Sequence, residues 1–232
     1  MSEPSPREAG AGQDAGGGQA PAPARLPDRR ALWIVLGGLG ALAALAALLW
    51  VNGTRPDAAP RDPAPGERPT AQLLRGEDGH LVVRSALVVE RPAADVFAVL
   101  TAYERFPEVF RGLWWDLSLE AVERQGEASA RLRGRIDVPL RAFPIDVVVH
   151  HARGAAGFAA RWDASSDDAA AGGRVVNRGS WEVRPLGPAR SLLVYTLEVR
   201  QPGVPAFLVT NVVLAQVRPT VDAVRRALDD PR

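Results

Sequence analysis

The sequence has 232 residues with 28 basic and 27 acidic side chains, and its net charge of +1 provides no strong field to attract nucleic acid. It contains no cysteine. This excludes disulfides, a thiolate nucleophile, cysteine-bound zinc and lipid attachment at a lipobox. Every basic residue is arginine, and the abundance of Ala, Gly and Pro indicates the coding bias of a GC-rich genome, so arginine content alone carries no functional signal.

A long apolar segment follows a polar amino-terminal tail. Residues 1–28 are rich in Gly, Ala, Pro, Ser and Gln and should be disordered, because they cannot bury enough apolar surface to offset chain entropy. Residues 31–51 form an unbroken apolar run that, at about 1.5 Å per residue, matches roughly 30 Å of hydrocarbon core. Trp33 and Trp50 stand at its two ends, where amphipathic rings favour the membrane interface. We predict a transmembrane helix from Ala31 to Val51.

Two other interpretations of this segment fit less well. A cleaved signal peptide is disfavoured because the run is too long for an h-region and no small-x-small site follows it. A buried soluble helix is disfavoured because a helix that is apolar all round needs a large core. Arg25, Arg29 and Arg30 favour an amino terminus on the inside, so we expect a single-pass protein of a bacterial inner membrane with an extracytoplasmic domain.

The segment after the apolar run separates it from a single domain. Residues 52–69 alternate proline with charged residues and should form an extended, semi-stiff linker. Residues 70–232 are then long enough for one domain of ordinary size.

The domain begins with strand and helix patterns in close succession. His80 to Glu90 is β-branched and alternating, which predicts a strand. Pro92 then opens a helix with Asp95 in its first turn, and a second short helix is expected from Ala102 to Phe110. Six further strands follow at the short spacing of antiparallel hairpins: 114–122, 128–138, 142–151, 158–163, 173–184 and 192–200.

Four of these strands alternate clearly enough to predict which side chains face the core, because a strand has period two. The expected inward residues are Ala128, Ala130, Leu132, Gly134, Ile136 and Val138; Phe143, Ile145, Val147, Val149 and His151; Val175, Asn177, Gly179, Trp181 and Val183; and Leu193, Tyr195, Leu197 and Val199. Asp167 and Asp168 fall in a loop rich in Gly, Ala and Ser.

The chain ends in a predicted amphipathic helix from Pro205 to Leu228. Apolar residues recur at helical spacing, and Pro219 should bend the helix near its middle. A long helix laid against a curved antiparallel sheet gives an α+β sandwich with space between its layers.

Three stretches resemble the START-like helix-grip superfamily, the SRPBCC proteins that include polyketide cyclases/dehydrases, lipid-transport proteins and coenzyme-Q-binding START proteins. The first is VVERPAADVFAVLTAYERFPEVF at 88–110, which is similar to the opening of the family. The second is GGRVVNRGSWEVRPLG at 172–187, and the third begins with LLVYTLEVRQPGVPAF at 192–207. The resemblance covers about residues 78–229, and its motifs identify a fold better than a ligand.

The resemblance implies a cavity between the sheet and the terminal helix that takes a lipid, an isoprenoid quinone or another apolar molecule. The many small residues on the inward faces are consistent with such a space, although aromatic residues there could equally fill an ordinary core. The expected ligand-binding residues are Leu132, Val147, Trp162, Asn177, Trp181, Tyr195, Leu208 and Val212.

The sequence offers little catalytic chemistry. His150 and His151 are adjacent on one strand and point to opposite faces, so they do not chelate one metal ion, and we expect neither a metal nor a cofactor. The candidates for a reaction are His151 as a general base with Tyr195 and Asn177, although a lone buried histidine is more often structural. Arg131, Arg133 and Arg135 form an outward basic stripe that either contacts anionic lipid or is simply solvated.

Three functions remain open. The first is a membrane-tethered, non-enzymatic binder or carrier of an apolar small molecule. The second is a cyclase or dehydratase that acts on a carbonyl substrate, which requires His151, Tyr195 and Asn177 to converge. The third is a module with a filled cavity that binds a protein partner.

Overall fold

The computed structural model describes residues 61–75, 80–113, 115–138, 141–168 and 173–230. The expected tail, the expected transmembrane helix and residues 52–60 of the expected linker lie outside these ranges. Within the described ranges, no helix is both long enough and apolar enough to cross a membrane.

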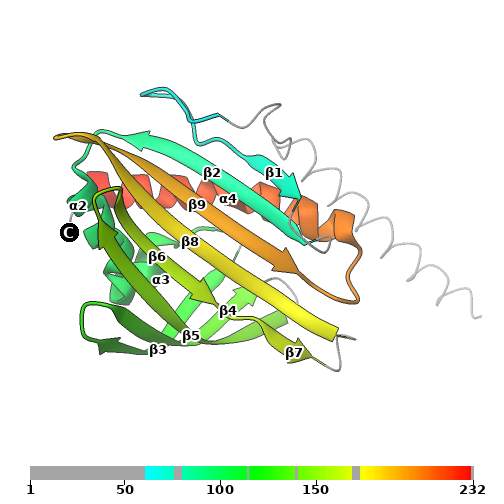
Figure 1. The fold of residues 1–232 in the computed structure, drawn as a ribbon. Helices are drawn as coiled ribbons and strands as arrows, with labels where there is room; N and C mark the ends of the chain where they lie inside the picture. The colour runs from blue at the N-terminus through cyan, green and yellow to red at the C-terminus, as the bar shows by residue number, and fades with distance from the viewer. Residues whose placement is uncertain (1–60, 76–79, 114, 139–140, 169–172, 231–232) are drawn as a thin grey trace, which may run out of the picture. The chain divides into compact units, whose positions relative to one another are not determined.

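The described strands form one antiparallel sheet in the order β1-β2-β9-β8-β6-β5-β4-β3, with β7 paired to β8 (Figure 1). The six strands after the first helices confirm the hairpin pattern expected from their spacing. The bounds are β1 Gln72–Arg75, β2 Leu81–Val89, β3 Asp116–Gln125, β4 Ser129–Val138, β5 Arg141–Gly154, β6 Gly157–Asp163, β7 Ser166–Asp168, β8 Gly173–Gly187 and β9 Arg190–Arg200.

Two strands were absent from the sequence prediction because each is too short to show a period of two. β1 has four residues and adds an edge to β2, and β7 has three residues and pairs with the start of β8. The loop expected around Asp167 and Asp168 was therefore wrong, since the backbone of both residues lies in β7.

The helices lie on the inner side of the sheet. α2 spans Ala93–Thr101, and its buried side chains include Val96, Phe97 and Leu100. The expected second helix is divided into a 3-10 turn, η2 Tyr103–Arg105, and the short α3 Phe106–Val109. α4 spans Ala206–Asp229 without interruption through Pro219 and packs against β2, β9, α2 and α3.

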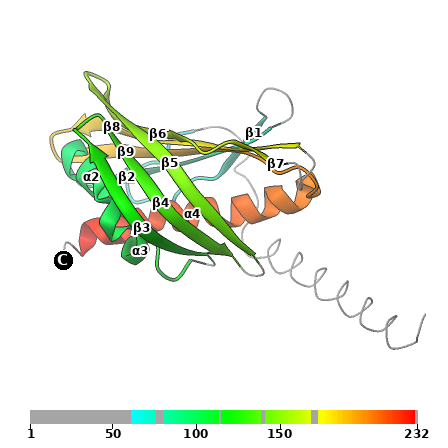
Figure 2. The ribbon, with the colours of Figure 1, turned by 90° about the horizontal axis from the view of Figure 1, so that it is seen from below.

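The two halves of α4 differ in burial. Its carboxy-terminal half carries Val221, Val224 and Leu228 into the main core, at the end of the sheet where α2 and α3 lie (Figure 2). Its amino-terminal half holds only half-buried or exposed side chains as far as Val213, and Phe207 is 61% exposed. The helix therefore closes the core at one end and leaves apolar side chains incompletely covered at the other.

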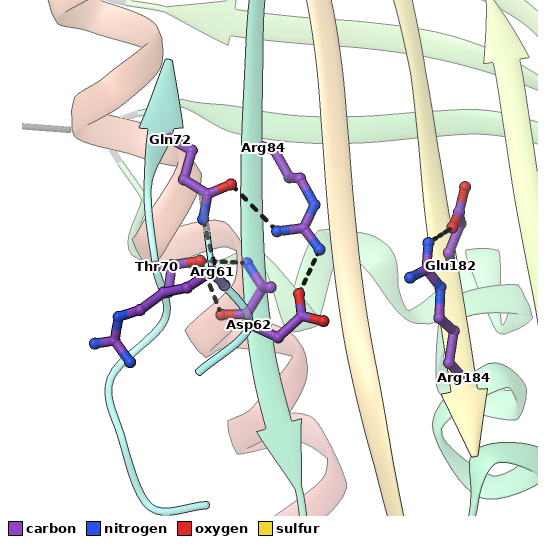
Figure 3. A network of polar contacts seen from close by, with 8 residues as sticks. Arg61, Asp62, Thr70, Gln72, Arg84, Glu182 and Arg184 are labelled. Atoms are coloured by element: carbon purple, nitrogen blue, oxygen red, sulfur yellow. Dashed lines mark hydrogen bonds and ion pairs between the residues drawn. The ribbon is translucent and has the colours of Figure 1, made fainter. Parts of the chain in front are cut away.

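The outer face of the sheet carries the segment from Arg61 to Pro69, which we call the strap (Figure 3). Asp62 accepts a hydrogen bond from Arg84 of β2 at 2.6 Å, and the Arg61 carbonyl accepts one from Gln72 of β1 at 2.9 Å. Arg61 also pairs with Glu67 at 2.8 Å within the strap. The last part of the expected linker is thus bound to the domain instead of standing free.

Candidate ligand-binding site

Three aromatic side chains from neighbouring strands meet on the inner face of the sheet. Trp181 of β8 stands directly opposite Tyr195 of β9, and their ring centroids are 4.4 Å apart. Trp162 of β6 is stacked against Tyr195 with a centroid distance of 6.1 Å. The indole N–H of Trp162 points at Asn177 Oδ1 across 3.4 Å. The structure therefore brings together Trp162, Asn177, Trp181 and Tyr195, four of the residues that the sequence analysis names as ligand-binding candidates.

Gly179 makes this arrangement possible. It stands opposite Trp162 in the pairing of β6 with β8. A Cβ atom at position 179 would lie 2.1 Å from Cζ2 of Trp162, so the indole ring occupies the space that any side chain there would need. A glycine in a strand commonly marks such a close approach.

The group formed by Trp162, Asn177, Trp181 and Tyr195, which we call the aromatic cluster, is only partly sealed. Trp181 is buried, whereas the other three members are half-buried. Burial raises the pKa of the Tyr195 phenol, which keeps it neutral. No described residue forms a hydrogen bond with its hydroxyl. The cluster thus presents flat apolar surface and neutral polar groups with free hydrogen-bonding capacity.

The other expected ligand-binding residues occupy two places. Leu132 and Val147 are opposite each other on β4 and β5, and both are buried in the main core. Leu208 and Val212 lie half-buried on the amino-terminal half of α4. None of these four contributes a polar group, so the chemical selectivity of the site rests on other residues.

His151 is placed away from Tyr195 and Asn177. In the row of paired residues across the sheet, Ala160 and Trp181 lie between His151 and Tyr195. Neighbouring strands are about 4.8 Å apart, so three steps separate the backbones of the two residues by roughly 14 Å along the sheet. The three candidate catalytic residues therefore do not converge.

Both ring nitrogens of His151 have partners. Nδ1 lies 2.9 Å from the carbonyl oxygen of Glu127, and Nε2 lies 2.6 Å from the hydroxyl of Tyr103. A carbonyl only accepts, so Nδ1 carries the proton, and Nε2 accepts the hydrogen bond that the Tyr103 hydroxyl donates. The pair joins β5 to the helical segment, which is a structural role. Burial also raises the pKa of Tyr103, so its phenol stays protonated.

The basic stripe on β4 is neutralised by carboxylates. Arg131 donates two hydrogen bonds to Asp146 at 2.7 Å, which lowers the pKa of that carboxyl group, and Arg135 donates to Asp137 at 2.8 Å. Arg133 pairs with Glu123. These pairs favour the solvated reading of the stripe over a site for anionic lipid.

Sequence reasoning missed two polar residues of the interior. Tyr103 lies 48 positions from His151, and no local pattern signals such a pair. Gln216 lies on α4 with a buried carbonyl oxygen, Oε1, that has no partner among the described residues. A lone amide between Val213 and Val217 was a signal available in the sequence, because polar residues on an apolar helix row are uncommon.

A shallow, open depression lies elsewhere, at the β5–β6 hairpin. It is lined by Phe158 and by Arg153, Arg161, Glu182 and Arg184 among others. Glu182 lies 2.8 Å from Arg184 and 3.9 Å from Arg161. This depression contains no member of the aromatic cluster.

Solved structures share the described arrangement. Human StAR-related lipid transfer protein 5 aligns with a TM-score of 0.53 and 11% identity over 82% of this chain and 96% of its own. A STAR-related lipid transfer protein fragment from Xanthomonas axonopodis aligns with a TM-score of 0.52 and 14% identity over 69% of this chain and 99% of its own. The domain has the START helix-grip fold. This confirms the fold expected from the sequence.

A further solved structure aligns with a lower TM-score. The Zhui aromatase/cyclase from Streptomyces sp. R1128 aligns with a TM-score of 0.47 and 17% identity over 64% of this chain and 93% of its own. Neither a scan of protein-family models nor a search of curated proteins gives a match. Proteins with one fold can have many functions, so the fold alone does not define the function of this chain, and the residues of the site must be considered.

Proposed function

We propose that the protein binds or carries an apolar small molecule between the sheet and α4, while its amino-terminal segment tethers it to a membrane. The observation that carries this proposal is the incomplete burial of the aromatic cluster and of the amino-terminal half of α4. The members of the aromatic cluster face the inner side of the domain, where an ordinary core would be sealed.

Physical chemistry favours an apolar guest at this place. Trp162 and Tyr195 offer flat rings, and burying apolar surface contributes about 25 cal/mol per Å². Tyr195 also packs against an apolar cluster that includes Val83, Leu214 and Val217. A guest that covers these surfaces gains hydrophobic free energy without displacing a charged residue.

The proposed tether would hold the binding site close to a membrane. Residues 31–51 have the length and composition of a spanning helix, and apolar ligands concentrate in the bilayer. Tethering raises the effective concentration of the domain at that surface.

Titration of residues 61–232 with Nile red, a neutral apolar dye, tests the proposal. We expect saturable binding with a blue-shifted emission. Val213→Trp should weaken binding at least tenfold, because Val213 packs against the same apolar cluster as Tyr195 and a larger ring fills the space. Arg226→Trp, on the exposed face of α4, is the matched control and should bind as the wild type does. Binding that is unsaturable, or equal in both variants, would contradict the proposal.

A further inference from the structure

The side-chain amide of Asn177 is held in one orientation by Trp162. The indole N–H of Trp162 lies 3.4 Å from Asn177 Oδ1. An indole N–H only donates hydrogen bonds, so the oxygen end of the amide faces it, and a reversed amide would bring two donors face to face. The Nδ2 end of the amide therefore points away from the indole.

The indole that orients Asn177 is itself fixed in place. Trp162 fills the space above Gly179, where a Cβ atom would lie 2.1 Å from its Cζ2 atom, and it stacks on Tyr195 with a centroid distance of 6.1 Å. Asn177 lies two residues before Gly179 on β8, so both residues belong to the inner face of the strand. The amide is thus held in the same layer as the rings of the aromatic cluster.

The Nδ2 group of Asn177 is a hydrogen-bond donor without an acceptor. No described residue accepts a hydrogen bond from it. The side chain is half-buried, and Nδ2 keeps accessible surface. Asn177 therefore presents an oriented donor that a small molecule beside Trp162 can reach.

The described side chains next to this amide on the inner face are uncharged: Trp162, Val175, Gly179 and Val199. Arg178, the next residue on β8, faces outward and donates a hydrogen bond to Asp163 at 3.0 Å. An ionised carboxylate bound at Asn177 would lose its hydration without gaining a counter-charge, which is strongly unfavourable. The acceptor that suits Nδ2 is therefore neutral.

We propose that the guest carries a neutral carbonyl group that accepts a hydrogen bond from Asn177 Nδ2 while its apolar body packs on Trp162 and Tyr195. This inference rests on the proposed binding function and narrows the ligand to an apolar ketone or ester. A carbonyl oxygen only accepts, whereas a hydroxyl would also need an acceptor for its own proton, and Asn177 Oδ1 is already engaged by Trp162.

Photoaffinity labelling of the full chain tests this inference in nanodiscs of a dialkyl ether phosphatidylcholine, a lipid that contains no carbonyl group. The two probes are a diazirine-bearing long-chain ketone and the matched hydrocarbon, in which a methylene group replaces the carbonyl. Saturation of labelling gives an apparent Kd for each probe, expressed as its mole fraction in the bilayer. We expect the ketone to bind about tenfold more tightly than the hydrocarbon, because only the ketone accepts a hydrogen bond from Asn177.

Two substitutions at position 177 remove the donor in different ways. Asn177→Leu replaces the whole amide by an apolar group of similar size, whereas Asn177→Asp keeps an oxygen for the Trp162 N–H and, when ionised, has no donor. We expect both variants to lose the preference for the ketone. Gln125→Leu is the matched control and should keep the preference, because it removes an exposed amide on β3 whose oxygen also accepts one hydrogen bond, from Ser129.

The outcomes separate this inference from the proposed function. Equal affinities of the two probes for the wild type, or a preference for the ketone that survives in either variant at position 177, would overturn the inference and leave the binding function standing. No saturable labelling by either probe would overturn both.

Discussion

At the scale of single residues, the contact between Tyr103 and His151 shows how the interior is fixed. Tyr103 is 2% exposed, and its ring lies stacked on His151 with centroids 5.8 Å apart. Phe97 of α2 meets the same imidazole edge-on at 5.9 Å. The hydrogen bond and the ring contacts together hold β5 against the helical segment, with Tyr103 as the fully buried partner.

Replacement of Tyr103 by Phe should lower the free energy of unfolding by about 1–3 kcal/mol, because it leaves Nε2 of His151 as a buried acceptor without a donor. Tyr195→Phe is the matched control. It removes a hydroxyl to which no described residue forms a hydrogen bond, so its effect should stay within about 0.5 kcal/mol. Urea denaturation measures both values, and equal losses in the two variants would contradict the assignment.

At the scale of elements, the two halves of α4 differ in how deeply their side chains are buried. Val221 is 0% exposed in the main core, whereas Val212 is half-buried on the amino-terminal half. The carboxy-terminal half therefore belongs to the closed core, whereas the side chains of the amino-terminal half stay partly exposed as far as Val213.

Truncation of one valine in each half tests this division. Val221→Ala should cost about 1.5–3 kcal/mol of stability because it opens a cavity in a closed core. Val212→Ala should cost less than about 1 kcal/mol, because water or a guest already reaches that side chain. Thermal or chemical unfolding gives both numbers, and a larger loss for Val212→Ala would show that the amino-terminal half belongs to the core.

The strap is a second element with a measurable property. Glu67 accepts a hydrogen bond from the Ala64 N–H at 3.0 Å and pairs with Arg61, and these contacts lower its pKa, the backbone hydrogen bond most. Both partners belong to the strap, so the lowered pKa of Glu67 favours the folded conformation of the strap, the form that docks, at pH values above the free pKa of about 4.3. This contribution disappears as the pH falls through the lower pKa of the folded strap.

Spin labels at Ala64→Cys and Arg184→Cys report docking of the strap, since the chain has no other cysteine. We expect a narrow distribution of distances at pH 7 and a broad one at pH 3. Glu67→Gln should already broaden the distribution at pH 7, whereas Glu127→Gln, on an exposed side chain outside the strap, should not. A distribution that is independent of pH would mean that Glu67 does not hold the strap.

At the scale of the whole molecule, the sequence predicted the helices, most of the strands and their arrangement in layers. It did not predict the hydrogen bonds between polar side chains that are distant in the sequence. Alternation along β4, β5 and β8 predicted an inward face, and the burial of Ala130, Val149 and Trp181 confirms it. On β9 both faces are buried, because Leu192 and Val194 pack with Ala86 and Val88 on the face opposite Leu193. Period-two and helical patterns depend on neighbouring residues, so one sequence is enough to find them.

Other features depend on residues that are distant in the sequence. The enzyme hypothesis required His151 to lie near Tyr195, since both face inward, but strand order places Ala160 and Trp181 between them. The partner of His151 comes from η2, and the strap binds β1 and β2 through side chains whose pairing no local pattern encodes. The sequence thus predicts which segments form strands and which face of a strand each side chain occupies. Which residue lies opposite it on the next strand depends on the order of the strands in the sheet.

The whole account depends on the domain holding an apolar guest. Native mass spectrometry of the full chain, purified from its membranes and followed by organic extraction, tests this most directly. We predict a one-to-one complex with a neutral apolar molecule that the Val213→Trp variant fails to retain. A chain that is isolated empty, and that takes up no apolar ketone, isoprenoid or lipid when these are supplied, would contradict the account.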